Sequence, residues 1–307
     1  MEACASAHFW ARELAAFGHT VKLIAPQFVK PYVMSNKNDA HDAAAICEAV
    51  GRPHMRFVSV KTLAQQSLLS LHRARQGFVH ARTAQANQIR GLLGEFGHVL
   101  PRGISHVQSQ LPAILEDAEN QLSVVSRQLF ARLLEHFKHL DRHVRELEEQ
   151  IRLLHRESEA SCRLERIPGI GPLTASALVA SIGDPRTFKN GRQLAAWIGL
   201  VPRQDLSGGK PRLLGISKRG DIYLRTLLVH GARSVLHCQS RRPQGGENWL
   251  NKLRARRHVN IAAVALANKN ARTVWHCSRT NENISRVTAP VQYPTEGGRH
   301  HDSALIF

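Results

Sequence analysis

The sequence predicts an α/β domain followed by a region that is mostly α-helical. Three observations support this: a helix–strand–helix order near the start, a heptad pattern in the middle, and a helical hairpin with a Pro-Gly-Ile-Gly turn after it. The 307 residues, 43% of them hydrophobic, suffice for two domains with sizeable cores. We expect an acidic α/β domain over 1–110, a coiled-coil or helical linker over 111–160, a C-terminal domain over 161–277 and a disordered tail over 278–307.

Charge is the strongest signal in the composition. Lys and Arg number 42 against 24 Asp and Glu, a formal net charge of +18, whereas the surface of a small domain usually carries about 2–8. The excess predicts a polyanionic partner, most simply nucleic acid, with an anionic membrane surface as an alternative. No apolar run is long enough to span a membrane, and five scattered Cys without a CxxC pair indicate a reducing compartment and no structural zinc.

The first fifty residues predict an incomplete α/β unit. A helix is expected over 3–17 and ends at Gly18, a buried strand follows over 19–25, and a second helix covers 39–50. Because no strand precedes the first helix, we expect that this segment borrows strands or lacks an upstream part. The residues expected on the buried side of the first helix are Phe9, Trp10, Leu14 and Phe17.

The middle of the chain predicts two long helices. Residues 61–96 form a basic helical pattern, and Gly and Pro break the pattern over 97–112. The second helix carries apolar residues at alternating steps of four and three, which is a heptad seam. This seam either pairs two protomers as a coiled coil or packs against the helix at 61–96 within one chain. Its members are Leu133, Phe137, Leu140, Val144, Leu147, Ile151 and Leu154.

A short helical hairpin opens the second half of the chain, with the turn Ile167-Pro-Gly-Ile-Gly171. It matches a helix-hairpin-helix motif, in which Gly169 and Gly171 let backbone N–H groups approach a DNA phosphate at a helix N-terminus. The alternative is a tight turn between two helices without any DNA contact.

Three carboxylates near the N-terminus oppose the global charge. Asp39 and Asp42 stand three residues apart at a predicted helix start, so they share one face, and Glu2 precedes the first helix. Carboxylate oxygens are the ligands that Mg²⁺ prefers, and paired ions of this kind assist phosphoryl transfer. The alternative, which spacing alone favours, is that the two Asp only interact with the dipole of their own helix.

A glycine-rich cationic region covers 186–225. It contains Ser207-Gly-Gly-Lys210 and Gly215–Gly220, with nine Lys and Arg against two Asp. A serine in such a loop could attack a phosphodiester, because nearby cations stabilise the alkoxide and the pentavalent phosphate. A flexible phosphate-binding turn is the alternative that these residues by themselves favour. A further basic stretch, 249–272, predicts contact with a DNA or RNA backbone, or else a solvated helix face.

Taken together, these segments resemble the insertion-sequence transposase family that includes the Piv and MooV DNA invertases. They run in family order over residues 1–275. The matching segments are Met1-Glu-Ala-Cys4, His19-Thr-Val-Lys-Leu-Ile-Ala-Pro-Gln-Phe-Val-Lys-Pro-Tyr32, Asn36-Lys-Asn-Asp-Ala-His-Asp42, Ile167-Pro-Gly-Ile-Gly171, Gly199-Leu-Val-Pro202, Ser207-Gly-Gly209, Ile216-Ser-Lys-Arg-Gly220, Tyr223-Leu-Arg225 and Trp249-Leu250.

The resemblance implies a role for each site. It implies an incomplete RuvC-like, ribonuclease-H-type domain in which Glu2, Asp39 and Asp42 are the second, third and fourth acidic residues of a Mg²⁺ site. It makes Ser207 the nucleophile that forms a covalent phosphoserine link to DNA, with Ser217 as the alternative. We expect DNA contacts at Gly169, Gly171, Arg203, Lys210, Arg212, Lys218, Arg219 and Arg225.

The resemblance also implies partners and a truncated start. The expected partners are double-stranded DNA at the element ends and the target, a noncoding guide RNA and further copies of the chain as a dimer or tetramer, with no membrane. The expected location is the bacterial cytoplasm, near the nucleoid. Because the family's first Asp and its strands would precede Glu2, we expect a copy about fifty residues short at its N-terminus.

The expected function is that of an insertion-sequence transposase, a DNA recombinase that uses a serine nucleophile assisted by a metal-binding acidic site. One alternative is a catalytically inactive remnant that only binds DNA or RNA. Another is a metal-dependent nuclease that forms no serine link.

Overall fold

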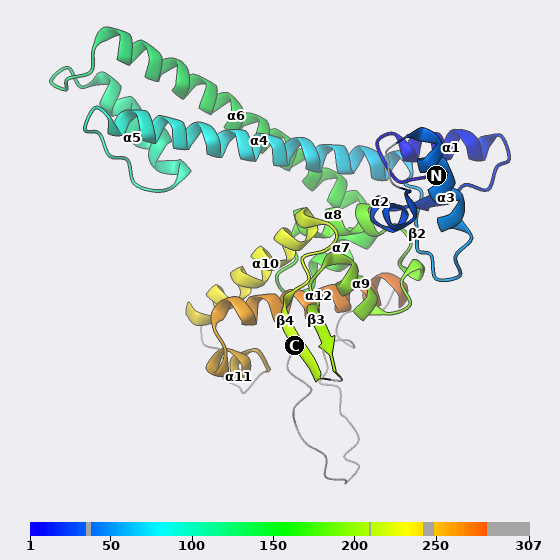
Figure 1. Ribbon diagram of the computed structural model, residues 1–307. Helices are drawn as coiled ribbons and strands as arrows, with labels where there is room; N and C mark the ends of the chain where they lie inside the picture. Colours follow the sequence, from blue (N-terminus) through cyan, green and yellow to red (C-terminus); the bar gives the residue numbers. More distant parts are fainter. Residues whose placement is uncertain (35–37, 209, 242–248, 281–307) are drawn as a thin grey trace. The chain divides into compact units, whose positions relative to one another are not determined.

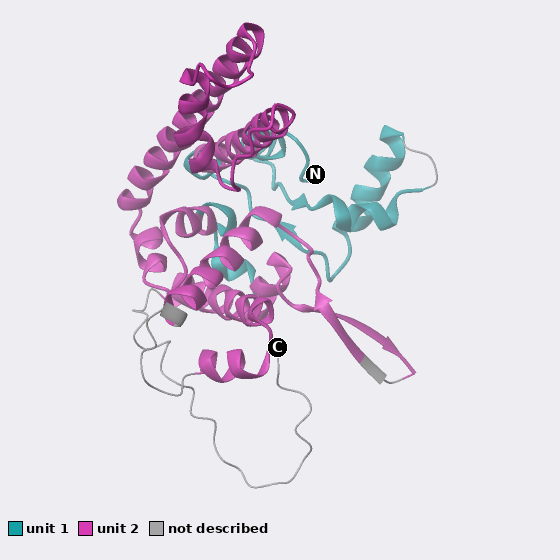
Figure 2. Ribbon diagram, turned by 90° about the vertical axis from the view of Figure 1, so that its left-hand side faces the viewer, with its two compact units in different colours: residues 1–66, 180–189 teal, residues 67–179, 190–307 magenta. Residues whose placement is uncertain are grey.

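The computed structural model describes residues 1–34, 38–208, 210–241 and 249–280, which are mostly α-helical (Figure 1). The chain divides into two compact units (Figure 2). Unit 1 contains Met1–Gln66 and Ala180–Lys189, and unit 2 contains the rest. The long helix that begins at Leu63, close to this division, packs with later helices of unit 2. Of the predicted tail, 278–280 are helical, and 281–307 lie outside the described residues.

Unit 1 contains a small sheet with β1 (Leu23–Ile24) at its centre. β1 pairs antiparallel with β2 (Phe57–Val58), and Glu2 forms a parallel bridge with Ile24 on the other side. The N–H of Ala3 donates to the Ile24 carbonyl at 2.7 Å, and the N–H of Ile24 donates to the Met1 carbonyl at 2.9 Å. Of the strand predicted over 19–25, only Leu23–Ile24 is therefore regular, and an isolated bridge at Glu2 lies on its other side.

The helix α1 (Ala7–Ala16) buries a different side from the predicted one. Ala7 and Ala11 are buried against Leu23, whereas the side chains of Phe9 and Trp10 are 45% and 51% exposed. Two alanines one turn apart allow the helix to lie close to β1, which bulky rings would prevent. Phe17 is also exposed, Leu14 is partly buried, and the prediction of an aromatic buried face is wrong.

The helix α3 (Asp39–Val50) begins and ends where the sequence predicts. The side chain of Asn38 accepts a hydrogen bond from the N–H of His41 at 3.0 Å, which caps the helix. On its inner side, Ala45 and Ala49 pack in a small core. The elements between β1 and α3 are α2 (Pro26–Val29) and η1 (Lys30–Tyr32).

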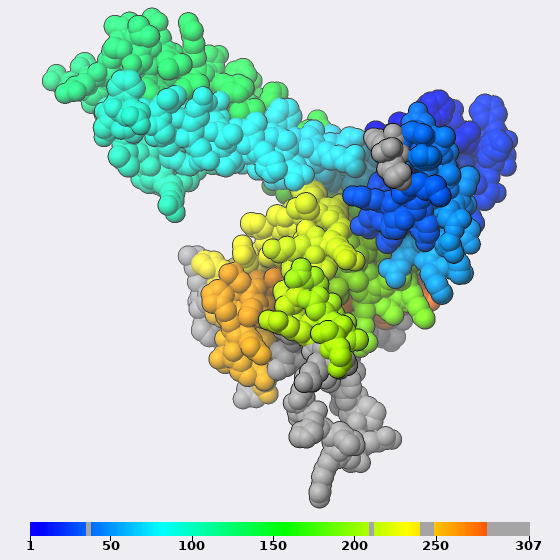
Figure 3. All heavy atoms as spheres, viewed as in Figure 1, coloured from blue at the N-terminus to red at the C-terminus, as the bar shows by residue number. Residues whose placement is uncertain are grey.

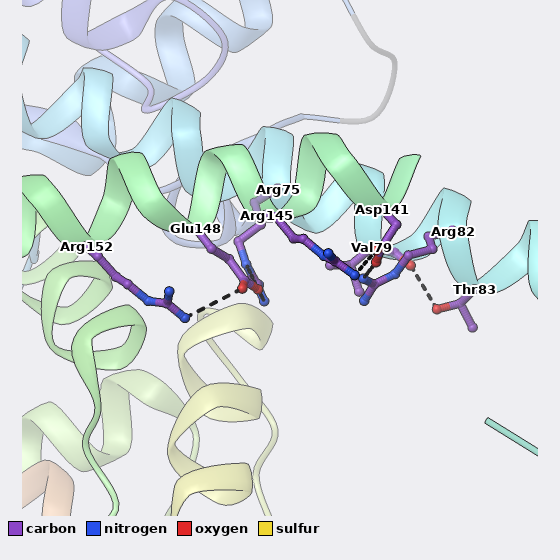
Figure 4. Close-up of polar contacts among 8 residues, drawn as sticks. All are labelled: Arg75, Val79, Arg82, Thr83, Asp141, Arg145, Glu148 and Arg152. Carbon is purple, nitrogen blue, oxygen red and sulfur yellow. Dashed lines mark hydrogen bonds and ion pairs between the residues drawn. The ribbon is translucent and has the colours of Figure 1, made fainter. Parts of the chain in front are cut away.

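The helices α4 (Leu63–Gly94) and α6 (Val124–Glu157) pack antiparallel within unit 2. Asp141 accepts from Arg82 at 2.5 Å, and Glu148 accepts from Arg75 at 2.9 Å (Figure 4). From the first ion pair to the second, the Arg lies seven residues earlier on α4 and the carboxylate lies seven residues later on α6. This is the spacing of antiparallel helices, so the two ion pairs define the register of α4 against α6. Asp141 also forms an ion pair with Arg145 of its own helix, with 2.6 Å between the Nη2 and Oδ2 atoms.

Packing within the chain is therefore the observed use of the heptad seam. Beyond the ion pairs, apolar residues of α4, α6 and α5 (Ile104–Glu116) form one core, so the predicted break over 97–112 ends where α5 begins. Leu154 is 38% exposed, and pairing of two protomers through α6 stays a prediction. The buried members of the core are Ala86, Ile89, Leu93, Leu100, Val107, Leu111, Leu122, Phe130, Leu134 and Phe137.

The C-terminal part of unit 2 surrounds the helix α12. This helix packs against α7, α9, α10 and α11. Every fourth residue of one face of α10 is buried: Leu224, Leu228, Ala232 and Leu236. The chain from residue 159 onwards contains, in order, α7 (Glu159–Glu165), α8 (Pro172–Ile182), η2 (Pro185–Thr187), α9 (Gly191–Ile198), β3 (Pro202–Ser207), β4 (Lys210–Ile216), α10 (Ile222–Arg241), α11 (Trp249–Arg256) and α12 (Val259–Thr280). Of these, η2 and the last residues of α8 belong to unit 1.

The turn between α7 and α8 touches α10 backbone to backbone. A Cβ atom added at Gly169 would lie 2.9 Å from the carbonyl oxygen of Gly231, and one added at Gly231 would overlap the carbonyl oxygen of Gly169. Gly169 also has a positive φ of 88°. The side chain of Asn270 donates to the Pro168 carbonyl at 2.9 Å, so α12 holds the same turn.

A buried polar group joins α4 to α8 and α10. The Nδ1 atom of His72 lies 3.0 Å from the Tyr223 hydroxyl, and its Nε2 atom lies 3.1 Å from the Ser176 hydroxyl. Burial, assisted by the charge of Arg75, lowers the pKa of His72 to about 4. The imidazole is therefore neutral at pH 7.

The close approach of the α7–α8 turn and α10 predicts a sharp difference between two glycines. Gly231→Ala should lower the free energy of unfolding by about 1–3 kcal/mol or more, because the new methyl group has no space. Gly171→Ala is the matched control, since no atom lies within 4 Å of its added Cβ. Chemical denaturation of both variants measures the difference, and equal stabilities would contradict this packing.

The neutral His72 predicts a loss of stability in acid. The pKa of His72 lies below its ordinary value of 6.5, so unfolding takes up a proton and stability falls as the pH drops from 6.5 towards 4. The full effect is about 3 kcal/mol. His72→Asn removes the titration, so the difference in unfolding free energy between wild type and variant should shrink over this window. A difference that is constant with pH would refute the prediction.

Candidate functional site

The cationic region around Ser207 forms a β-hairpin. β3 and β4 pair antiparallel, with Ser207 opposite Lys210 and Asp205 opposite Arg212. Only two residues separate the paired Ser207 and Lys210 in the sequence, as in the shortest common hairpins. Figure 2 shows the hairpin extending away from the helices of unit 2.

The register separates the two faces of this hairpin. Residues paired across the two strands share a face, and successive residues along one strand point to alternate faces. Ser207 therefore lies on the same face as Asp205 and Arg212. Leu206 and Leu213 lie on the other face, and both are exposed. Ser207 is itself exposed and terminates β3. Its hydroxyl is therefore accessible on a polar, partly cationic face.

The predicted DNA-contacting residues of the hairpin are placed as follows. Arg203 and Arg212 are exposed, and Arg203 stands where the register of the two strands shifts. Lys210 belongs to β4, but its side chain lies outside the described residues, as does Gly209.

The loop after β4 is held tightly against the end of α9. The N–H of Ser217 donates to the Val201 carbonyl at 2.8 Å, and the N–H of Lys218 donates to the Gly199 carbonyl at 3.1 Å. A Cβ atom at Gly199 would overlap the carbonyl oxygen of Arg219. Lys218 has a positive φ of 55°, which is rare outside glycine and accumulates at functional positions.

Arg225 stabilises this loop from within the protein. Its Nη1 atom donates to the Ile198 carbonyl and to the Arg219 carbonyl, both at 2.8 Å. The first bond satisfies a carbonyl at the end of α9, where a positive charge is favourable. Arg225 is thus engaged inside the fold, while Lys218 and Arg219 are exposed.

The two candidate serines differ in access. The Ser217 hydroxyl oxygen is buried and has no hydrogen-bond partner among the described residues, whereas Ser207 is exposed. A buried hydroxyl without a partner costs about 1–3 kcal/mol, so its position is set by the loop and not by its own bonding.

The helix-hairpin-helix turn presents one of its two glycines to solvent. Gly171 is exposed just before α8, where N–H groups of a helix N-terminus lie. Gly169 is half-buried against Gly231, and its role here is packing.

The three predicted metal ligands all belong to unit 1. Asp39 and Asp42 occupy the first turn of α3, and Glu2 lies on the bridge to β1. Carboxylates suit Mg²⁺, but the described residues contain no group of three acidic, His or Cys side chains that could hold a metal ion. The three carboxylates therefore suit Mg²⁺ by their chemistry, but the structure does not bring them together as one site.

The basic stretch 249–272 contains a contact between two helices that its sequence pattern does not predict. The Nζ atom of Lys269, on α12, lies 5.0 Å from the ring centroid of Trp249, on α11. The two residues are twenty apart, so no periodicity predicts this pair; the only local signal was an aromatic residue at the start of a basic helix. No helix in the described part of the chain is both long and apolar enough to cross a membrane.

Two family models match the chain. The model described as "Transposase IS116/IS110/IS902 family" matches residues 161–245, which include the hairpin and the Ser217 loop. A model of transposases of the DEDD IS110 type matches residues 3–97, which include Asp39 and Asp42.

Relatives match over most of their length. A "Probable family 20 transposase" of Pseudomonas aeruginosa is 52% identical over 276 residues, which are 90% of this chain and 82% of the relative. The transposase for insertion sequence element IS1111A of Coxiella burnetii is 45% identical over 90% of this chain and 76% of its own length. That for IS1328 of Yersinia enterocolitica is 45% identical over 90% of this chain and 81% of its own. The chain therefore belongs to the IS116/IS110/IS902 family and is an insertion-sequence transposase, an enzyme that cleaves and joins DNA.

Proposed function

We propose that this transposase exchanges DNA strands through a covalent serine–DNA intermediate, with Ser207 as the nucleophile. The observation that carries the proposal is the exposed position of Ser207 at the end of β3, on the same hairpin face as Arg212. A hairpin that extends from a packed base can bring an exposed hydroxyl to a DNA backbone without unfolding the core.

The proposed step is a transesterification. The Ser207 oxygen bonds to phosphorus, and one bond between phosphorus and a deoxyribose oxygen breaks. The proton lost by the serine balances the proton taken up by the departing oxygen. The phosphoserine conserves the phosphodiester energy, so attack by the hydroxyl of another strand can rejoin DNA. Guanidinium groups beside the reacting phosphate, such as Arg212, would stabilise its developing negative charge.

Ser217 is the alternative nucleophile in this proposal. Its hydroxyl is buried, and its loop is fixed by the bonds to Gly199 and Val201. Attack by Ser217 would require this loop to open, which favours Ser207.

We propose DNA backbone contacts at the α7–α8 turn, along the hairpin and in the loop after β4. The exposed candidates are Gly171, Arg203, Arg212, Lys218 and Arg219. Lys210 is proposed with them from the sequence, and its side chain lies outside the described residues. Gly169 and Arg225 act in this scheme by holding the turn and the loop in place.

We propose Asp39 and Asp42 as ligands of a divalent metal ion, Mg²⁺, with Glu2 as a third ligand. The support is the donor type, the match to the DEDD model and the placement of both Asp on one helical turn. When bound, Mg²⁺ would supply positive charge that polarises phosphate oxygens. The small sheet of unit 1 would then belong to a RuvC-like fold, as the resemblance to the Piv and MooV invertases implies.

The remaining partners are carried by the resemblance. They are duplex DNA at the element ends and the target, a noncoding guide RNA and further copies of the chain as a dimer or tetramer. The net charge of +18 supports the nucleic acids. A cytoplasmic location near the nucleoid stays a prediction.

An inactive DNA- or RNA-binding remnant is the second candidate. The observation in its favour is that the described residues do not gather three metal ligands, although the basic surfaces are intact. A metal-dependent nuclease without a serine link is the third, and the adduct experiment below separates it from the first.

Trapping the covalent intermediate tests the nucleophile. Incubation with labelled element-end DNA, followed by denaturing electrophoresis, should show a protein–DNA adduct with the wild-type chain. Ser207→Ala should abolish the adduct, and Ser217→Ala should retain it. Loss of the adduct only in Ser217→Ala would reverse the assignment. Wild-type cleavage without an adduct would indicate the nuclease, and no reaction at all would indicate the remnant.

Calorimetric titration with Mg²⁺ or Mn²⁺ tests the acidic site. The double variant Asp39→Asn/Asp42→Asn should lose the binding heat, because amides are weaker ligands than carboxylates. The loss of favourable helix-dipole interactions should cost only about 0.3–1 kcal/mol per residue, so the fold should survive. Glu13→Gln, an exposed carboxylate on α1, is the control. Equal binding by the double variant and the control would contradict the assignment.

A further inference from the structure

We propose that the outer face of α11, together with Lys269 of α12, binds single-stranded nucleic acid by stacking an unpaired base on Trp249. This site is separate from the serine and carboxylate sites and does not depend on them. The argument rests on the exposure of one ring, the charges around it and the way in which α11 is anchored.

Trp249 presents a large aromatic surface beside a fixed cation. Its side chain is 45% exposed, and the Nζ atom of Lys269 lies 5.0 Å from its ring centroid. Leu250 and Leu253 are buried and anchor α11 on the protein, so the indole is held on a rigid support. Figure 3 shows the orange surface of this helical region open to solvent. Aromatic rings in this setting stack with any base, because every base has a flat π-face.

The charges around Trp249 fit a phosphate backbone. Lys252 and Arg256 follow Trp249 by three and seven residues, so they share its face of α11. From Trp249 to Thr280 the chain contains no Asp or Glu. The seven cations in this stretch are Lys252, Arg254, Arg256, Arg257, Lys269, Arg272 and Arg279.

A strongly basic stretch with an exposed ring favours nucleic acid over the other polyanionic surface, a membrane. A helix that binds at a membrane surface uses an apolar face, and the apolar face of α11, with Leu250 and Leu253, is turned into the protein. A duplex is also a poorer fit, because its bases are already stacked on one another. An unpaired nucleotide supplies both the free base and the phosphates, in either DNA or RNA.

Anisotropy of fluorescent oligonucleotides tests the proposal with the full chain. Oligo(dT), oligo(U) and a duplex of the same length are compared in wild type, Trp249→Ala and Trp249→Phe. Trp249→Ala should weaken single-strand binding by about 5- to 100-fold, and Trp249→Phe should restore most of it. Trp10→Ala, which removes an exposed Trp of unit 1, should have no effect. The same loss in the Ser207→Ala background would show that the site is independent of strand exchange.

Salt dependence separates stacking from charge. Trp249→Ala should leave the slope of log Kd against log salt unchanged, whereas Arg256→Ala should reduce it by about 0.7 for a single strand. Unaltered single-strand affinity in Trp249→Ala would overturn the proposal. So would an equal loss for the duplex, or binding of anionic phosphatidylserine vesicles in place of oligonucleotides. A Trp249→Phe variant as weak as Trp249→Ala, with a lowered melting temperature in both, would show a purely structural role.

Discussion

The C-terminal part of unit 2 depends on the contact between the backbones of Gly169 and Gly231. No side chain separates the α7–α8 turn from α10 at this point, so the position of α10 against the turn is fixed. Its first turns are then placed for two other tasks. Tyr223 contacts His72 of α4, and Arg225 holds the carbonyls at the end of α9 and in the loop after β4. One steric constraint therefore positions the base of the hairpin and its connection to the long helices.

A rigid base and an exposed end suit an enzyme that must reach DNA. The loop that contains Ser217 is bonded to α9, and Lys218 adopts a left-handed backbone conformation that only a well-determined surrounding maintains. Ser207, at the other end of the strands, is exposed. In the proposed roles, the Ser217 loop therefore stabilises the base of the hairpin, and Ser207 contacts DNA.

The long helices were predictable in extent but not in partnership. A heptad seam indicates that one face of α6 is covered, yet it is equally compatible with a partner in the same chain or in another. The ion pairs Arg82–Asp141 and Arg75–Glu148 show that α4 is the partner of α6, and their residues lie beside the heptad seam and not within it. In α1 the local pattern was misleading, because two alanines and not the aromatic residues meet β1. Close packing selects small residues, which hydrophobicity alone ranks low.

The sequence by itself determined the charge, the bounds of α3 and α4, the position of the α7–α8 turn and the order of segments that resembles the family. These properties depend on composition and on neighbours within a few residues. The tertiary structure alone decided that Arg225 and Gly169 serve the fold, that the glycine-rich region is a hairpin, and that the Lys269 ammonium lies over the ring of Trp249. Each of these depends on atoms brought together from distant parts of the chain, and local periodicity contains no information about such pairs.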